Sequence, residues 1–220
     1  MKVAICFSGL PRLDSPISIK KWQYYINLYN ADVFVHTWVL DESEKNDTID
    51  KIVSYFKPKI FKLEKSRDYP LHEYKHRVWP NLVPYNVFSA FAGIYECMEL
   101  VNKYSTANKF EYDYVIRARF DIFVDNLTLD PINGIAVIDD PSKHCLKFRY
   151  RGLDLFGISD IFAYGSQQNM NLYSNVSNHI HTLYHGEGVD MCSELLLTSN
   201  LVRQGVSISF QPIQAVLVRR

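Results

Sequence analysis

The 220-residue sequence has no surplus of charge of either sign, because 24 lysine and arginine residues balance 24 aspartate and glutamate residues. Proteins that bind nucleic acid without sequence preference depend on a positive field, which this balance does not supply. We therefore expect no nucleic-acid partner. Hydrophobic residues make up 47% of the chain, which excludes a disordered protein.

Cysteine is scarce and long apolar runs are missing. The four cysteines show no Cys-x-x-Cys spacing, which argues against a zinc site or a redox motif. Cys6 and Cys97 lie in apolar patterns and are expected to be small buried side chains. The apolar run at residues 2–7 is too short for a signal peptide or a membrane-spanning helix. We therefore expect a cytoplasmic protein without a transmembrane segment.

Glycine-rich nucleotide-binding loops are also missing. The segment FSGLPR at residues 7–12 holds a single glycine, so it matches neither the dinucleotide fingerprint nor the Walker loop. It does follow a predicted strand, and ligands of open parallel sheets bind beyond the carboxyl ends of strands. Gly9 would let the backbone approach a nucleotide, and Arg12 could meet a phosphate. The alternative is an ordinary turn.

What the chain does contain is an alternation of strand and helix patterns. Apolar runs at residues 2–7, 31–38 and 59–63 alternate with helical stripes over residues 16–29 and 49–56. This order predicts an α/β fold of Rossmann-like type, with a mostly parallel central sheet flanked by helices on both faces. Since neither a repeat nor a linker interrupts the chain, we expect a single domain over residues 1–220.

The rest of the chain continues the pattern less regularly. Further strands are predicted at residues 112–123, 135–138, 161–164 and 206–210. Further helices are predicted at residues 84–104, from residue 166 to about residue 180, and at residues 190–204. A loop or a short irregular helix is expected at residues 64–83, and an exposed connection that contains histidine and arginine is expected at residues 139–154.

The most informative stretch is DYVIRARFD at residues 113–121, where charged residues stand in a predicted strand. Along a strand, alternation places Arg117, Arg119 and Asp121 on one face, opposite an apolar face. Unpaired charges buried there would be costly, so a partner is required. An anionic ligand with a metal would serve, because guanidinium groups match phosphate oxygens and a carboxylate suits Mg²⁺ or Mn²⁺. The alternative is a solvated edge strand or an internal ladder of arginine–aspartate ion pairs.

Two other acidic residues stand near predicted element boundaries. Asp160 begins a strand within SDIFAYGS at residues 159–166, and Glu194 lies in the first turns of the last helix. Asp160 has the residue type of a turn former, and Glu194 would interact favourably with the helix dipole. Ser166 is predicted to cap the helix that follows it.

Several of these segments together resemble a known family. FSGLPR, NVFS at residues 86–89, YVIRARFD at residues 114–121, SDIFAYGS and ELL at residues 194–196 follow one another in this order. This resembles the small GT-A-type glycosyltransferases of capsule and lipopolysaccharide gene sets and of large algal viruses, such as the chlorella-virus capsid glycosyltransferases. The resemblance spans most of the chain. It implies a GT-A fold and sugar transfer from a nucleotide-sugar donor, with a UDP-sugar preferred, to a glycan or glycoprotein acceptor.

The resemblance also implies a donor site with Mn²⁺ or Mg²⁺. An Asp-x-Asp motif holds the metal in GT-A enzymes, and the matching triplet here is Arg119-Phe120-Asp121. Asp121 is therefore the expected metal ligand, although Arg119 replaces the first aspartate and could neutralise phosphate itself. The residues expected at the nucleotide and its diphosphate are Ser8, Gly9, Arg12, Arg117 and Arg119.

Asp160 or Glu194 would then orient or deprotonate the acceptor hydroxyl. An inverting enzyme needs such a base and a retaining enzyme can work without one, and the residues do not separate these outcomes. A catalytically silent nucleotide- or sugar-binding module of the same fold is the alternative function. A sugar nucleotidyltransferase normally has a glycine-rich N-terminal loop with a lysine, and the single Gly9 argues against it.

Overall fold

A seven-stranded sheet forms the centre of the protein in the computed structural model, which describes residues 1–39, 45–80, 82–138 and 146–218. In spatial order the strands are β10 (Ile208–Gln211), β6 (Ile135–Ile138), β9 (Phe162–Gly165), β4 (Tyr114–Ala118), β1 (Val3–Gly9), β2 (Asp32–Val39) and β3 (Ile60–Lys65). Only β9 runs antiparallel to its neighbours, and the other pairs are parallel. The prediction of a mostly parallel sheet is confirmed.

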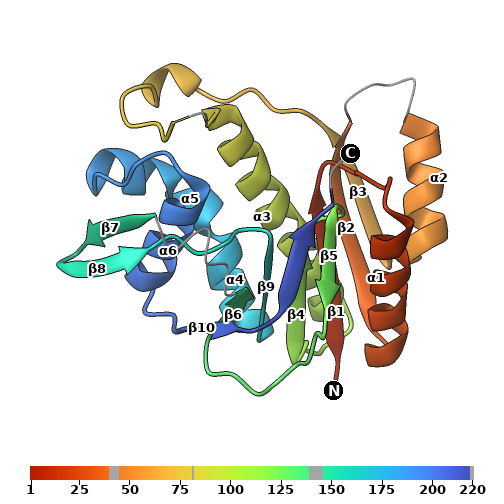
Figure 1. Cartoon of the computed structure of the whole chain (residues 1–220). Helices are drawn as coiled ribbons and strands as arrows, with labels where there is room; N and C mark the ends of the chain where they lie inside the picture. The colour runs from red at the N-terminus through yellow and green to blue at the C-terminus, as the bar shows by residue number, and fades with distance from the viewer. Residues whose placement is uncertain (40–44, 81, 139–145, 219–220) are drawn as a thin grey trace.

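Helices cover both faces of this sheet (Figure 1). One face is covered by α1 (Pro16–Tyr29) and α2 (Lys45–Phe56), and the other by α3 (Pro84–Ala107), α4 (Gln167–Ser174), α5 (Val176–His181) and α6 (Ser193–Arg203). Strand β1 shows how the sequence produces these two layers. Ile5 and Phe7 belong to the core beneath α1 and α2, whereas Ala4 and Cys6 belong to the core beneath α3.

Local signals place the helix starts as predicted. The Ser15 hydroxyl accepts a hydrogen bond from the Ser18 N–H at the start of α1. The Ser166 hydroxyl accepts one from the Asn169 N–H at the start of α4. Cys6 and Cys97 are both buried, as their apolar surroundings indicate.

The predicted strand over residues 112–123 is wrong as a single element. Strand β4 ends at Ala118, the chain turns at residues 120–121, and β5 (Ile122–Asp125) leaves the main sheet to pair antiparallel with β11 (Gln214–Leu217). The sequence pattern does not reveal this break, because Phe120 is buried with its ring against Phe7 and so continues the apolar alternation through the turn. Arg119 and Asp121 therefore lie beyond the strand that holds Arg117.

Other boundaries also differ from the prediction. The helix expected from residue 166 to about residue 180 is divided at Asn175 into α4 and α5. The strand expected at residues 206–210 is present as β10, with its boundaries shifted to Ile208–Gln211. In the connection expected at residues 139–154, residues 139–145 lie outside the described part, and a hairpin of β7 (Lys147–Tyr150) and β8 (Leu153–Phe156) follows. No helix among the described residues has the length and apolarity needed to cross a membrane.

Candidate active site

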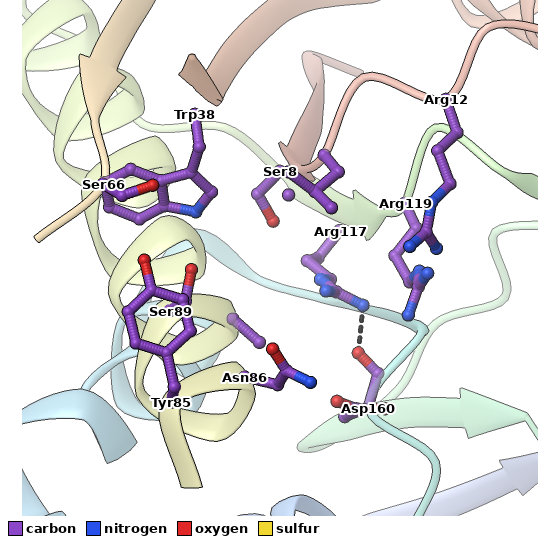
Figure 2. A pocket seen from close by; sticks show the side chains of 13 residues that line it. Ser8, Arg12, Trp38, Ser66, Tyr85, Asn86, Ser89, Arg117, Arg119 and Asp160 are labelled. Atoms are coloured by element: carbon purple, nitrogen blue, oxygen red, sulfur yellow. Dashed lines mark hydrogen bonds between the residues drawn. The ribbon is translucent and has the colours of Figure 1, made fainter. Parts of the chain in front are cut away.

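A cavity of about 410 Å³ opens at the carboxyl ends of β1, β2 and β4. Its walls come from the strand ends and the segments that follow them, from the first turns of α3, and from the approach to β9 (Figure 2). The lining residues are Ser8, Gly9, Leu10, Arg12, Trp38, Ser66, Tyr85, Asn86, Ser89, Ala90, Arg117, Arg119 and Asp160. This is the edge of a parallel sheet where ligands bind in open α/β folds.

The turn after β1 brings main chain to the cavity wall. Gly9 has a φ of 111°, a conformation that side chains disfavour, and a Cβ built there would meet nothing within 4 Å. Thr37 holds the turn by donating a hydrogen bond to the Gly9 carbonyl at 2.8 Å. Ser8 is buried, yet its hydroxyl has no hydrogen-bond partner among the described residues. A buried hydroxyl without a protein partner indicates that a ligand or a water forms a hydrogen bond with it.

Arg117 brings a buried positive charge to the same wall. The residue is only 4% exposed, and its Nη1 donates a hydrogen bond to the Asp160 carbonyl. Its Nε has no partner within the described part of the chain. Burial lowers the pKa of Arg117, although an arginine retains its charge in proteins. The cavity therefore contains a cation whose donors are incompletely used.

Asp121 is held between two other guanidinium groups. Arg119 donates from Nε to Oδ1 at 2.8 Å and from Nη2 to Oδ2 at 2.7 Å, and Arg12 donates from Nη1 to Oδ2 at 2.9 Å. Burial acts to raise the pKa of Asp121, but the hydrogen bonds and charges of the two arginines outweigh it, so the pKa is lowered. The ion pairs of the alternative interpretation are thus present, and they sit beside a cavity that both arginines line.

This arrangement does not fit a divalent cation on Asp121. Both carboxylate oxygens accept hydrogen bonds from guanidinium groups, and the carboxylate is only 2% exposed. A cation would have to displace a guanidinium group or share the carboxylate with two positive charges. Asp121 as a metal ligand stays a prediction, and these contacts do not favour it.

A second cavity of about 550 Å³ adjoins the first. The two share Asn86, Ala90, Arg119 and Asp160 in their linings. The second is lined in addition by a mostly apolar set and by the acidic Glu194: Trp79, Pro80, Leu82, Val83, Val87, Leu146, Ile161, Cys192, Ser193, Glu194 and Leu217. Asp160 therefore lies at the junction of the two cavities, where molecules bound in the two cavities would meet.

The two acidic candidates occupy different places. Asp160 lines both cavities, and Glu194 lines only the second. The Glu194 carboxylate is buried and accepts hydrogen bonds from Cys192 at 3.2 Å and Ser193 at 3.3 Å. Burial, reinforced by Glu194, raises the pKa of Cys192 to about 12, which leaves this thiol protonated. The structure thus brings the predicted donor-site residues and Asp160 together around the first cavity. Asp121 lines neither cavity, and Glu194 lines only the second.

Two aromatic residues of the first cavity were not predicted. Trp38 and Tyr85 lie on the same side of the cavity, away from the arginines (Figure 2). The Trp38 indole N–H is buried without a partner among the described residues, and Arg67 lies over its ring at 5.6 Å. The sequence did contain a signal for Trp38 as a cavity residue, because Trp38 lies at the carboxyl end of a strand just as Ser8 does.

A hydrogen-bonded network of charged and polar side chains lies beside Trp38. His36 is fully buried, packs edge-on against Trp38 and contacts Glu64 through Nε2 at 2.7 Å. Lys62 and Arg67 also pair with Glu64. Burial lowers the pKa of His36 despite the opposing effect of Glu64. Burial acts to raise the pKa of Glu64, but its hydrogen bonds prevail and lower it to about 2.

Comparison with known proteins identifies the fold. A crystal structure of an active-site mutant of LgtC is similar with a TM-score of 0.55 and 9% identity, covering 95% of this chain and 72% of that chain. A crystal structure of galactosyltransferase LgtC in complex with donor and acceptor sugar analogues covers 95% of this chain and 73% of that chain, with 8% identity and a TM-score of 0.48. No protein-family model and no curated protein matches the chain. The first similarity shows that this chain has the GT-A fold.

Proposed function

We propose that this GT-A-fold chain is a glycosyltransferase that uses a nucleotide-sugar donor, with a UDP-sugar preferred. The observation that carries the proposal is the convergence of Arg12, Arg117 and Arg119 on a cavity at the carboxyl ends of the parallel strands. Guanidinium groups bind phosphate oxygens through paired hydrogen bonds. The sequence resemblance to capsule, lipopolysaccharide and algal-virus glycosyltransferases points the same way, and the subgroup stays a prediction.

The cavity has separate regions for the parts of such a donor. A nucleobase would lie between Trp38 and Tyr85, where flat aromatic faces suit stacking. The diphosphate would lie against the arginines and the Ser8 hydroxyl, whose hydrogen-bonding capacity is incompletely used. The sugar would then reach Asn86 and Asp160, which lie at the junction of the two cavities. A volume of about 410 Å³ falls within the usual range for small-molecule sites.

The second cavity would hold the acceptor, a glycan or glycoprotein. Trp79 offers an apolar ring face for a sugar, and Glu194 offers carboxylate oxygens for its hydroxyl groups. In the transfer step an acceptor oxygen bonds to the anomeric carbon of the donor sugar. The bond from that carbon to the β-phosphate oxygen breaks, and the nucleoside diphosphate leaves with the electron pair. Asp160 would orient the hydroxyl, and in an inverting reaction it would take the proton. In a retaining reaction the departing diphosphate oxygen would take that proton.

The arginines would stabilise the charge that builds on the departing diphosphate. Such preorganised electrostatic stabilisation is a major source of rate acceleration. Mn²⁺ or Mg²⁺ supplies the same neutralisation in many GT-A enzymes, and the contacts of Asp121 described above make guanidinium groups the better candidates here. The nucleotide panel described next tests the base and the sugar of the donor.

Thermal denaturation with a panel of nucleoside diphosphates and nucleotide-sugars tests the proposal. A true donor at a hundredfold excess over Kd should stabilise the fold by about 2.7 kcal/mol and should release nucleoside diphosphate slowly. Arg12→Gln should reduce the stabilisation, and Arg149→Gln on β7 should not, because Arg149 is exposed and lines neither cavity. Binding without any turnover would favour the silent module. A panel without any stabilising nucleotide would refute the donor site.

A further inference from the structure

The connection between β3 and α3 carries a carboxylate close to two imidazole rings on a distant part of the chain. Glu73 ends the short helix η1 (Leu71–Glu73), His181 ends α5, and His185 lies in the π-helical turn η3 (Thr182–Gly186). One possible ligand atom from each residue lies within 4.8 Å of the other two, and all three residues are exposed. No other such group of histidine, cysteine or acidic residues occurs in the described part of the chain.

Two imidazoles and one carboxylate form a chemically specific set. Residues four apart on a helix lie on the same face, and the His181 and His185 ring centroids are 4.6 Å apart. Imidazole nitrogen suits Zn²⁺ and related transition metals, whereas Mg²⁺ and Ca²⁺ prefer oxygen ligands. Three protein ligands with a water in the fourth position is the arrangement of many catalytic zinc sites, so this set would leave one coordination position to water.

Tyr74 supplies the support that metal-binding histidines usually have. Its hydroxyl lies 3.2 Å from Nδ1 of His181, and its ring is almost completely buried beside both histidines. A histidine ligand commonly donates its second ring N–H to a neighbouring oxygen, which fixes the tautomer and the ring orientation. When the Tyr74 hydroxyl accepts from Nδ1–H, the lone pair of His181 Nε2 is left for a metal.

We propose that Glu73, His181 and His185 form a transition-metal site of the Zn²⁺ class, which fastens the β3–α3 connection to the α5–η3 segment. The connection is already anchored next to this site. The N–H groups of His76 and Arg77 donate to the Tyr184 hydroxyl, and Arg77 and Trp79 exchange main-chain hydrogen bonds with Met191. A metal would extend this anchorage to η1, which is only three residues long.

The position of the site gives it a consequence for the two cavities. The connection leaves β3 at Ser66, which lines the first cavity, and reaches Trp79 and Val83, which line the second. Glu73 lies between these walls in sequence. On the proposed function, a metal here would order walls of both the donor and the acceptor spaces without touching either substrate.

Calorimetric titration of the chelator-stripped full chain with Zn²⁺ alone tests the site without any nucleotide. We expect one ion per chain and no comparable binding of Mg²⁺. Tyr74→Phe should weaken Zn²⁺ binding by about 10- to 100-fold, and Glu73→Gln or His185→Ala should weaken it further. His76→Ala is the matched control, because His76 is an exposed histidine on the same connection and lies outside the set; it should leave the affinity unchanged.

Amide hydrogen exchange provides the readout for the fastening itself. Zn²⁺ should slow exchange in residues 71–79 and 176–186 of the wild-type chain, and it should not do so in His185→Ala. Stoichiometric Zn²⁺ binding that survives both Glu73→Gln and His185→Ala would overturn the site, as would absence of binding to the wild type. Binding without added protection of residues 71–79 would overturn the fastening role. Since no donor is present, these outcomes are independent of glycosyl transfer.

Discussion

Arg119 donates a bidentate pair of hydrogen bonds to Asp121, two positions later in the chain, with Nε–Oδ1 at 2.8 Å and Nη2–Oδ2 at 2.7 Å. Arg12 completes the contact from the loop after β1. The same two guanidinium groups line the cavity proposed for the donor. Asp121 thus sets the positions of two cavity arginines that lie far apart in sequence.

Replacing Asp121 should damage the fold as well as the site. In Asp121→Asn the two arginines lose their shared negative partner in a place where the carboxylate is almost completely buried. Breaking a buried ion pair by removing one partner costs about 3–5 kcal/mol, and we expect the lower end because Arg12 is partly exposed. Urea denaturation measures the loss. Asp125→Asn, which removes the partner of Lys21 at a more exposed site, should cost much less; equal losses would contradict this role for Asp121.

Donor binding should depend on arginine rather than on a divalent cation at Asp121. A hydrogen bond to a charged group contributes about 1.5–3 kcal/mol, so Arg12→Gln should weaken UDP binding by about 10- to 100-fold. Calorimetric titration with UDP should give nearly the same Kd in EDTA as in Mn²⁺. The comparison is best made in the His185→Ala background, where the proposed outer metal site is removed. A Kd that rises in EDTA as much as in Arg12→Gln would restore Asp121 as a metal ligand.

Asp160 should matter more for transfer than Glu194. Asp160 lines both cavities, whereas Glu194 reaches only the second. Loss of a positioned general base lowers rates by about 10²–10⁴-fold, so in an inverting reaction Asp160→Asn should lower kcat to that extent with UDP affinity retained. Glu194→Gln should chiefly raise the KM for the acceptor. Asp154→Asn on the exposed face of β8 is the control, and a larger kcat loss in Glu194→Gln than in Asp160→Asn would reverse the assignment.

Local signals explain why much of the fold was predictable. The strands and helices of the first third are marked by apolar periodicity and by Ser15 before Pro16, and these depend on neighbours in sequence. The positions of Arg117 and Arg119 were predictable because charges on a buried strand require a partner, and that of Arg12 because it follows the end of a strand.

Contacts between distant segments explain what was missed. Strand β11 pairs with β5 across about ninety residues of chain, for example Val216 with Phe123, and no local pattern reports such a pairing. One wall of the second cavity is formed by Trp79, whose main-chain N–H donates to the Met191 carbonyl. The Glu73 site likewise joins a segment that looked irregular to a helix end more than a hundred residues later.

The contact between the buried His36 and the half-buried Glu64 predicts how stability depends on pH. Since burial lowers the pKa of His36, the folded chain keeps this imidazole neutral at a pH where the unfolded chain, with a pKa of about 6.5, takes up a proton. The free energy of unfolding should therefore fall as the pH drops below about 6.5, by at most about 1.4 kcal/mol per pH unit from this group. Glu64, with its pKa lowered to about 2, adds a second loss below the ordinary glutamate pKa.

Urea denaturation between pH 8 and pH 5 separates this effect from general acid sensitivity. His36→Asn removes the titrating group and should flatten the dependence between pH 7 and pH 5.5, whatever its effect on stability at pH 8. His72→Ala removes a largely exposed imidazole and should leave the slope unchanged. A slope that persists in His36→Asn and disappears in His72→Ala would assign the dependence to surface histidines. The same titration followed by the tryptophan fluorescence that Trp38→Phe removes should report any loosening of the wall beside His36, because the centroids of the two rings are 4.7 Å apart.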